Sequence, residues 1–264
     1  MSADHTAPLR IATFNVNSIR QRAGHVARFL ERQKPDLLFL QETRCLPEQV
    51  PEVEFTALGY TTHAVGQKGG RNGVACIARV PFTVIGEELP GEAEDDHARF
   101  IEVDAEGIRC MGIYLPNGNS GGDAGFAYKL RWMERLAALA QERLDAFLPL
   151  AILGDFNVCP TDADLAPGAL PPTDALVRPE SRGRWRALEY LGLTDALKAL
   201  HPTHTPFTYW DYGAAFDANR GLRIDHILLS AELAERCTAC TVDTAPRAEA
   251  QPSDHTPVIC DIGR

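Results

Sequence analysis

LAILGDFNVCP, residues Leu150–Pro160, is the stretch of sequence that decides the fold. It begins with an apolar run between Pro149 and Gly154 that is too short for a helix, so it predicts a buried strand. Asp155 and Asn157 follow, and residues two apart in an extended chain point to the same face. A carboxylate and a carboxamide at a strand end suit a hard metal ion, an activated water or a phosphate oxygen. The same residues are also typical of a turn in which Asp and Asn bind their own backbone.

The composition is that of a sizeable globular chain with an acidic balance. Its 264 residues, 45% hydrophobic and 23% charged, suffice for one large domain with a substantial core. Lys and Arg number 26 against 36 Asp and Glu, giving a formal net charge of −10. This excludes a protein that coats nucleic acid non-specifically. A polyanionic substrate would have to be met by locally clustered arginine and by a bound cation.

The cysteines and the N-terminus indicate the compartment. The chain has 7 cysteines, an odd number that lies mostly inside apolar runs, which favours reduced, buried thiols. Cys237 and Cys240 have zinc-knuckle spacing, but no second pair or paired histidines accompany them. The start, MSADHTAPLR, lacks the features of a signal peptide, and no apolar run reaches membrane-spanning length. We therefore expect a cytoplasmic protein without membrane association, with a frayed tail over residues 1–8 and one domain over residues 9–264.

The first half of the chain is predicted to form a strand, a helix and a second strand, followed by a run of short antiparallel strands. Strands at 9–16 and 36–41 flank an amphipathic helix that begins after Ser18 and ends before Pro35. Short runs broken by Gly, Pro and acidic residues then predict antiparallel strands at 60–65, 73–79, 82–87, 99–104 and 108–114.

A long amphipathic helix follows, from Phe126 to Phe147. The simplest interpretation of its basic residues is a solvated face that contains Lys129, Arg131, Arg135 and Arg143. The remaining elements are a long loop at 160–179, a helix near 185–191, a pair of strands around 223–229 and a last strand at 256–262.

Polar side chains stand at or beside these strand ends: Asn15, Glu42, Asp155, Asn157, Asp225, Asp254 and His255. Strand ends of packed sheets gather loops at one edge, where sites form. One histidine among carboxylates and carboxamides favours Mg²⁺ or Mn²⁺ over zinc. Such a set suits phosphodiester hydrolysis, which needs a cation at a phosphate oxygen, a group that positions water, and donors for the developing charge.

Six short motifs carry a family resemblance: Asn15-Val16-Asn17, Gln41-Glu42, Tyr114-Leu-Pro-Asn117, Gly154-Asp-Phe-Asn157, Arg223-Ile-Asp225 and Ser253-Asp-His255. With TYWDYGAAFDANRGLRID and QPSDHTPV, the chain resembles the endonuclease/exonuclease/phosphatase superfamily from about Leu9 to Ile262, and most closely the bacterial exonuclease III branch of apurinic/apyrimidinic endonucleases. The resemblance implies a four-layer α/β sandwich in which two packed sheets, mixed or antiparallel, are flanked by helices.

The resemblance also implies an activity. The expected enzyme is a monomeric, Mg²⁺-dependent DNA repair phosphodiesterase, with Mn²⁺ as a plausible substitute. It would act on double-stranded DNA, cleave on the 5′ side of abasic sites to leave a 3′-hydroxyl, and remove nucleotides or blocking groups from 3′ ends. Two alternatives stay open: an RNA or phosphoinositide phosphoester hydrolase of the same superfamily, and a catalytically silent nucleic-acid-binding relative.

Roles at the metal and the water follow from the matching motifs. Glu42 looks like the principal metal ligand, and Asn15, Asp254 and Asn17 would complete or support the cation site. Asp155 resembles the residue that orients or deprotonates the attacking water.

The remaining matches concern the phosphate. Asn157 and Tyr114 look like donors to the scissile phosphate, with Asn117 nearby. His255 resembles the family histidine that contacts the phosphate, held by Asp225, whose carboxylate should raise the pKa of the imidazole and orient it. The sequence leaves the general base open between Asp155, His255 and the phenolate of Tyr114.

In the family, residues at Tyr209, Leu222 and Ile224 help form a pocket for a base-free sugar. Leu222 stands where one branch has tryptophan, which leaves the pocket size and the balance of endonuclease to exonuclease activity open. Packing in the core is a competing explanation for these side chains. The candidates for contacts along the DNA backbone are Arg99, Arg182 and Arg220, for which ordinary surface charge is an equal alternative.

Overall fold

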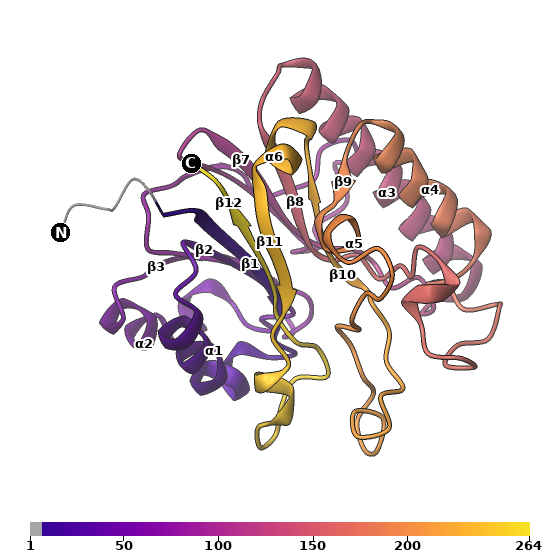
Figure 1. Ribbon diagram of the computed structural model, residues 1–264, viewed down its shortest axis with the longest axis horizontal. Coiled ribbons are helices and arrows are strands. Elements are labelled where there is room, and N and C mark those ends of the chain that lie inside the picture. Colours follow the sequence, from indigo (N-terminus) through magenta and orange to yellow (C-terminus); the bar gives the residue numbers. More distant parts are fainter. Residues whose placement is uncertain (1–6) are drawn as a thin grey trace.

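The computed structural model describes residues 7–264 (Figure 1). The predicted tail at 1–8 therefore lies outside the described residues except for Ala7 and Pro8. Within the described range the chain forms two six-stranded sheets. None of its helices there combines the length and the hydropathy that crossing a membrane requires.

The first sheet has the strand order β11-β12-β1-β2-β4-β3. β1 and β2 are parallel, and all other neighbours in this sheet are antiparallel. Its strands are β1 (Leu9–Asn15), β2 (Leu37–Gln41), β3 (Thr61–Val65), β4 (Val74–Ala78), β11 (Cys237–Val242) and β12 (Val258–Ile262).

The second sheet repeats this plan with the strand order β5-β6-β7-β8-β10-β9. Here β7 and β8 are the parallel pair, and the other neighbours are antiparallel. Its strands are β5 (Thr83–Gly86), β6 (Phe100–Ala105), β7 (Ile108–Tyr114), β8 (Leu150–Asp155), β9 (Thr194–Asp195) and β10 (Asp225–Leu229).

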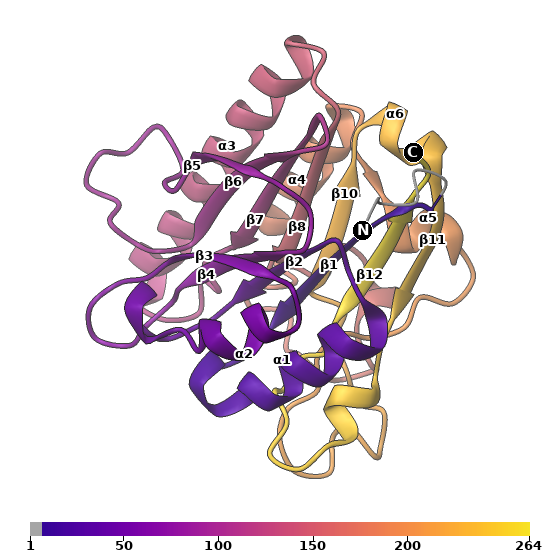
Figure 2. The same ribbon diagram turned by 90° about the vertical axis from the view of Figure 1, so that its left-hand side faces the viewer.

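Helices cover the outer faces of both sheets (Figure 2). The helices are α1 (Ile19–Gln33), α2 (Glu52–Ala57), α3 (Gly122–Asp145), α4 (Pro179–Tyr190), α5 (Ala196–Leu200) and α6 (Ala231–Arg236), and single 3₁₀ turns occur at Pro47–Gln49, Asp162–Asp164 and Ala245–Ala248. One apolar cluster fills the space between the sheets, a second lies under α1 and α2, and a third lies under α3 and α4. This layering confirms the predicted four-layer α/β sandwich.

Strand β1 shows why the layers form. Leu9 and Ile11 belong to the cluster between the sheets, whereas Ala12 and Phe14 belong to the cluster under α1 and α2. Alternate residues of a strand point to opposite faces, so a strand that is apolar on both faces must be covered on both.

One predicted element is wrong in detail, and one strand was missed. The pair of strands expected around 223–229 is a single strand, β10, whose further partner is the two-residue strand β9. Strand β11 was not predicted, although it forms the edge of the first sheet beside β12.

The predicted solvated face of α3 is also wrong. Lys129 is fully buried, Arg135 donates to Asp95 at 2.6 Å, and Arg143 donates to Glu102 of β6 at 2.7 Å. Only Arg131, with 53% of its side chain exposed, lies in solvent as expected. The helix therefore has polar partners in strand β6 and in a neighbouring loop, as well as an apolar face on the sheet.

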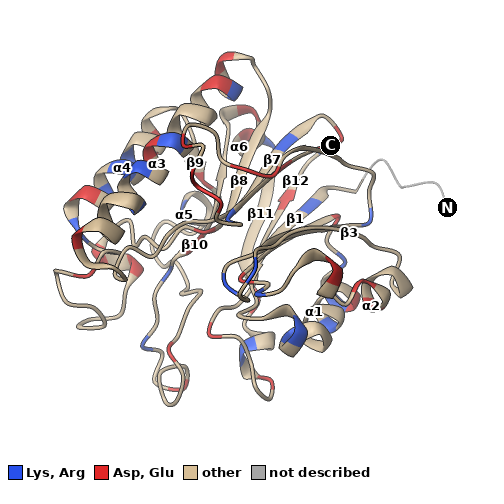
Figure 3. Ribbon diagram, turned by 180° about the vertical axis from the view of Figure 1, so that it is seen from behind, with Lys and Arg blue, Asp and Glu red and all other residues tan. Residues whose placement is uncertain are grey.

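The charged residues and the cysteines are distributed as the sequence led us to expect. Acidic and basic residues are interspersed along the ribbon, without separation by sign (Figure 3). All seven cysteines are free, and each except Cys237 is buried. The sulfur atoms of Cys237 and Cys260 lie 3.4 Å apart, and both thiols are free.

Candidate active site

The carboxyl ends of the two parallel strand pairs meet at one edge of the sandwich. In the first sheet, Asn15 at the end of β1 lies opposite Gln41, and Glu42 follows directly. In the second sheet, Asp155 at the end of β8 lies between Tyr114 of β7 and Asp225 of β10. The strand ends thus bring together the polar residues that the sequence places after separate strands.

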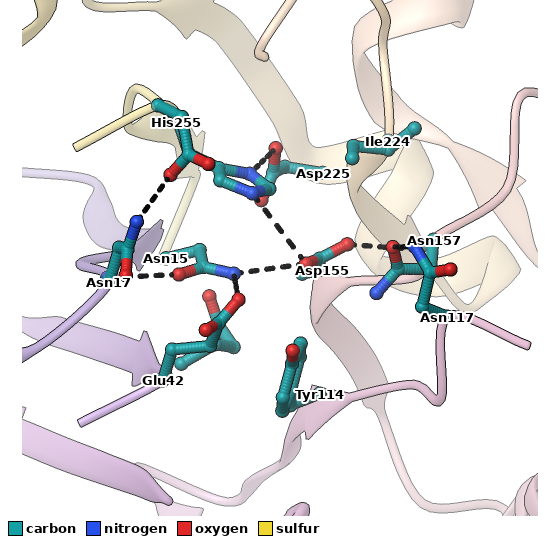
Figure 4. Close-up of polar contacts among 12 residues, drawn as sticks. Asn15, Asn17, Glu42, Tyr114, Asn117, Asp155, Asn157, Ile224, Asp225 and His255 are labelled. Carbon is teal, nitrogen blue, oxygen red and sulfur yellow. Dashed lines mark hydrogen bonds and ion pairs between the residues drawn. The ribbon is translucent and has the colours of Figure 1, made fainter. Parts of the chain in front are cut away.

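The central group comprises Glu42, Asp155 and His255 (Figure 4). One carboxylate oxygen from each acid and one imidazole nitrogen all lie within 4.8 Å of one another. The first two side chains come from different sheets, and His255 comes from the turn before β12. Residues from separate parts of the sequence must lie this close together if they are to form one site.

Asn15 ties the two acids together. Its Nδ2 donates to Glu42 Oε1 and to Asp155 Oδ2, each at 3.0 Å. Its Oδ1 accepts from the backbone N–H of Asn17 at 3.1 Å, and Asn17 in turn donates to Asp254 Oδ1 at 3.1 Å. In this arrangement Asn15 and Asn17 hold the carboxylates in place as hydrogen-bond donors. The oxygens of Glu42, Asp155 and Asp254 are hard donors that fit a divalent cation.

The charges at this site are strongly coupled. Burial raises the pKa of the Asp155 carboxyl to about 7 against the opposing charge of His255. Burial lowers the pKa of His255, but the carboxylates of Asp225 and Asp155 outweigh it and raise that pKa to about 10. For Glu42, burial is outweighed by the hydrogen bond from Asn15 and by the charge of Arg44, so its pKa is lowered. The acid beside β2 is therefore ionised at neutral pH, and the imidazole holds its proton.

His255 is held as the sequence predicted. Its Nδ1 lies 2.8 Å from Asp225 Oδ2, and its Nε2 lies 3.8 Å from Asp155 Oδ2. The Tyr209 ring packs edge-on against the imidazole, with the ring centroids 5.0 Å apart. Asp225 and Asp155 thus contact opposite sides of one ring.

On the other side of Asp155, two asparagines meet. Asn117 Nδ2 donates to Asn157 Oδ1 at 2.9 Å, and Asn157 Nδ2 donates to the carbonyl of Leu115 at 2.9 Å. The backbone N–H of Asn157 donates to Asp155 Oδ1 at 2.9 Å, so the predicted backbone-binding turn is present within the site itself. Tyr114 stands beside this group, and burial, with the charges of Glu42 and Asp155, raises the pKa of its phenol.

These side chains line a cleft of about 310 Å³. Its lining includes ten residues that were singled out from the sequence: Glu42, Tyr114, Asn117, Asp155, Asn157, Tyr209, Leu222, Ile224, Asp254 and His255. At one end Leu222 and Ile224 pack with Cys159 and Leu176 in a small apolar cluster. The cleft therefore has an acidic floor and an apolar end.

The three predicted DNA-contacting arginines lie outside the cleft lining. The Arg99 guanidinium lies over the Tyr114 ring, 4.5 Å from its centroid. Arg182 donates to the carbonyl of Cys159 at 3.0 Å and pairs with Asp162 at 2.8 Å. Arg220 is exposed and lines a separate hollow. Of the three, Arg99 is the one in contact with a residue of the cleft.

Several residues that support the site were given no role from the sequence. Arg44 donates to Glu42 Oε2 at 2.9 Å, and its position two residues after that acid was the available signal. Ser253 donates to the backbone carbonyl of Asn15 at 2.7 Å. Thr208 donates to Asp225 Oδ2 at 2.7 Å, and no pattern in the sequence distinguishes it from other threonines.

Replacing Thr208 with valine should destabilise the protein by about 1–3 kcal/mol, the cost of leaving buried polar groups unpaired. The Thr208 hydroxyl also accepts from the backbone N–H groups of Ile224 and Asp225, so the variant removes three hydrogen bonds at once. Urea denaturation measures the change. Thr62→Val is the matched control because the buried Thr62 hydroxyl has no partner in the structure. Equal stability of the two variants would contradict the expectation.

Comparisons with known proteins agree with this geometry. Residues 12–255 match the Endonuclease/Exonuclease/phosphatase family. The chain is 34% identical to exodeoxyribonuclease III of Haemophilus influenzae, over 96% of this chain and 100% of the relative. It is similar in structure to an AP endonuclease from Archaeoglobus fulgidus, with a TM-score of 0.90, 36% identity, and coverage of 96% of this chain and 99% of the other.

A further solved structure is the 3′ phosphatase NExo from Neisseria bound to a product DNA hairpin. It has a TM-score of 0.92 and 33% identity, and the match covers 97% of this chain and 100% of the other. Two six-stranded sheets, the convergent acids and a family match across nearly the whole sequence point the same way. The chain belongs to the endonuclease/exonuclease/phosphatase family.

Proposed function

We propose that this chain is a DNA repair phosphodiesterase that uses Mg²⁺, with Mn²⁺ as a substitute. It would cleave double-stranded DNA on the 5′ side of abasic sites, leave a 3′-hydroxyl, and remove nucleotides and blocking groups from 3′ ends. The observation that carries the proposal is the approach of Glu42, Asp155 and His255 to within 4.8 Å beside donors in one cleft. Relatives named exodeoxyribonuclease III, AP endonuclease and 3′ phosphatase support the substrate class.

Glu42 and Asp254 would hold the cation, with Asn15 and Asn17 fixing these carboxylates through hydrogen bonds. The bound cation would neutralise a phosphate oxygen in the transition state. Arg44 partly balances the charge of Glu42 and keeps its second oxygen in place.

Asp155 is the proposed general base. With its pKa raised by burial to about 7, it is basic enough to accept a proton from water near neutral pH. His255 keeps its proton because its pKa is raised, and the raised pKa of Tyr114 keeps the phenol protonated. Among the three candidates that the sequence left open, these pKa directions favour the carboxylate of Asp155 as the group that accepts a proton.

The remaining polar groups would act as donors. His255, Tyr114 and Asn157 would donate to the phosphate oxygens as negative charge builds up on them, with Asn117 holding Asn157. Water would attack phosphorus and give its proton to Asp155. The bond from phosphorus to the 3′ oxygen would break, and the leaving oxygen would take up a proton to become the 3′-hydroxyl.

The apolar end of the cleft suits a sugar that carries no base. Leu222 and Ile224 lie there with Tyr209 nearby, and the two aliphatic side chains offer apolar contact without hydrogen-bonding groups for a base edge. Arg99, Arg182 and Arg220 stay candidates for the DNA backbone, with Arg99 nearest the cleft. We also propose that residues 9–264 act as one catalytic domain in a monomer, and that the free buried thiols reflect a cytoplasmic location.

The test is a duplex that carries one tetrahydrofuran lesion, incubated with purified protein. With Mg²⁺ we expect incision on the 5′ side of the lesion and a product with a 3′-hydroxyl. EDTA should abolish the incision, and added Mn²⁺ should restore it.

Parallel substrates separate the alternatives. A duplex with a recessed 3′ end or a 3′-phosphate tests end trimming, and poly(A) RNA and inositol phosphates test the other members of the superfamily. Turnover of the RNA or the inositol phosphates without cleavage of DNA would contradict the proposal. DNA binding without metal-dependent turnover would identify a silent relative.

A further inference from the structure

A lysine lies buried beneath the candidate active site. Lys129, in the first half of α3, has no exposed surface. Its Nζ donates to the backbone carbonyl of Asn117 at 3.0 Å and to that of Asn157 at 2.6 Å. A buried amine needs such partners, because burying an unpaired polar group is costly. Here both partners belong to residues of the cleft.

The two carbonyls come from turns that follow different strands. Asn117 follows β7 and Asn157 follows β8, and their side chains are joined by the 2.9 Å hydrogen bond between the amides. Asn157 has a φ of 48°, in the left-handed region that is uncommon for residues other than glycine, although asparagine is enriched there. The hydrogen bond from Lys129 to its carbonyl is one of the contacts that maintain this conformation.

Packing of the lysine stem supports the same arrangement. Gly118 has a φ of +87°, and a Cβ placed there would lie 2.6 Å from Cδ of Lys129. The turn that carries Asn117 therefore lies directly on the aliphatic part of this side chain. Lys129 thus contacts the turn that carries Asn117 in two ways. Its aliphatic stem packs against Gly118, and its amine donates to the Asn117 carbonyl.

We propose that Lys129 is a positioning residue for phosphodiester cleavage, which joins the turns at 115–118 and 156–158 and thereby fixes the amides of Asn117 and Asn157 against the phosphate. This inference rests on the proposed function. Lys129 does not line the cleft, and its Nζ donates to the carbonyl of Asn157, so it would act through that residue. Burial lowers the pKa of the amine to about 7, yet carbonyl oxygens accept from the amine in either protonation state.

The experiment uses Lys129→Met, which keeps the length of the stem and removes the donors. On the tetrahydrofuran duplex we expect kcat to fall by about 10²-fold, the scale of a small misplacement of catalytic groups. KM should change less than kcat, because the other proposed contacts to the DNA backbone, those of Arg99, Arg182 and Arg220, lie outside this turn. Arg131→Met, an exposed substitution on the same helix, is the matched control and should leave kcat unchanged.

A double-mutant cycle separates positioning from general destabilisation. If Lys129 acts through Asn157, then Lys129→Met should slow the Asn157→Ala protein no further. Full additivity of the two losses would overturn the proposal, as would wild-type kcat in Lys129→Met.

The Lys129→Met protein could fail to fold, and a second variant covers that case. Lys129→Gln, which is shorter and retains donors, is the second variant in case the methionine variant does not fold. If neither variant folds, the lysine is a stability residue and the positioning role is overturned. The wild-type reaction reports separately on the function: a wild-type protein that leaves the duplex intact refutes the proposed function, and with it any positioning for that reaction.

Discussion

Asp155→Asn protein should cleave an abasic duplex about 10²–10⁴-fold more slowly than wild type, the range that one general base contributes. The asparagine keeps the size of the side chain but cannot accept the proton of the attacking water. Its neighbours Asn15 and Asn157 donate to the carboxylate oxygens, so the amide also presents an –NH₂ group where an acceptor is needed. Single-turnover kinetics on a tetrahydrofuran duplex measure the loss.

The fold should survive this change. Because burial raises the pKa of Asp155 to about 7, above its value in the unfolded chain, the charged carboxylate opposes folding increasingly as the pH rises from about 4 to 7. Removing the charge should therefore offset part of the cost of the hydrogen bonds that the amide cannot accept, and the variant should stay folded at pH 7. Asp195→Asn is the contrasting control: Arg223 lies 2.6 Å away and outweighs burial, so the pKa of that carboxyl is lowered and its loss should reduce Tm. Near-normal cleavage by folded Asp155→Asn protein would refute the general-base role.

The second large effect is expected for Glu42→Ala. Loss of the principal carboxylate should raise the half-saturating Mg²⁺ concentration by at least about 10–100-fold, the loss reported even for outer-shell partners of a metal. At saturating Mg²⁺, kcat should still be about 10²–10³-fold below wild type, because stabilisation of the developing charge is impaired. Titration of activity with Mg²⁺ gives both values.

The control for Glu42→Ala is a substitution of Arg44, the arginine that donates to Glu42. Arg44→Ala removes the partner of Glu42 without removing a proposed ligand, so it should alter the Mg²⁺ requirement far less. If the two variants had the same Mg²⁺ dependence as wild type, Glu42 would not be a metal ligand.

The architecture was predictable where the chain has strong local patterns. The apolar runs of β2 and β8 are buried along their whole length, so short hydrophobic segments identified them. β11 was missed because only Cys240 among its six residues is buried, and the strand is defined by pairing with β12 across a register shift at Cys237 and Ala239. An edge strand of small, half-exposed residues carries little periodicity of its own.

In the site, too, residues within local motifs were predictable, and residues defined by distant contacts were not. Motifs beside strand ends identified Glu42, Asp155 and His255, and the structure brings these three together. Lys129 was misplaced because helical periodicity indicates which residues share a face, whereas the turns that cover this residue come from other parts of the chain. Thr208 was missed for the same reason, since its importance lies in one contact with Asp225.

The pairing of β1 with β12 has a consequence for biosynthesis. β1 begins at Leu9, and its antiparallel partner ends at Ile262, so the first sheet closes through contacts between very distant parts of the chain. Such contacts form late in folding, since a long loop must close before they are gained. A ribosome-bound nascent chain that stops short of Val258 lacks β12, the strand that pairs with β1. The same strand follows His255 and anchors the turn carrying that residue. We therefore expect unfinished chains to lack the assembled edge at which Asn15, Glu42 and His255 meet.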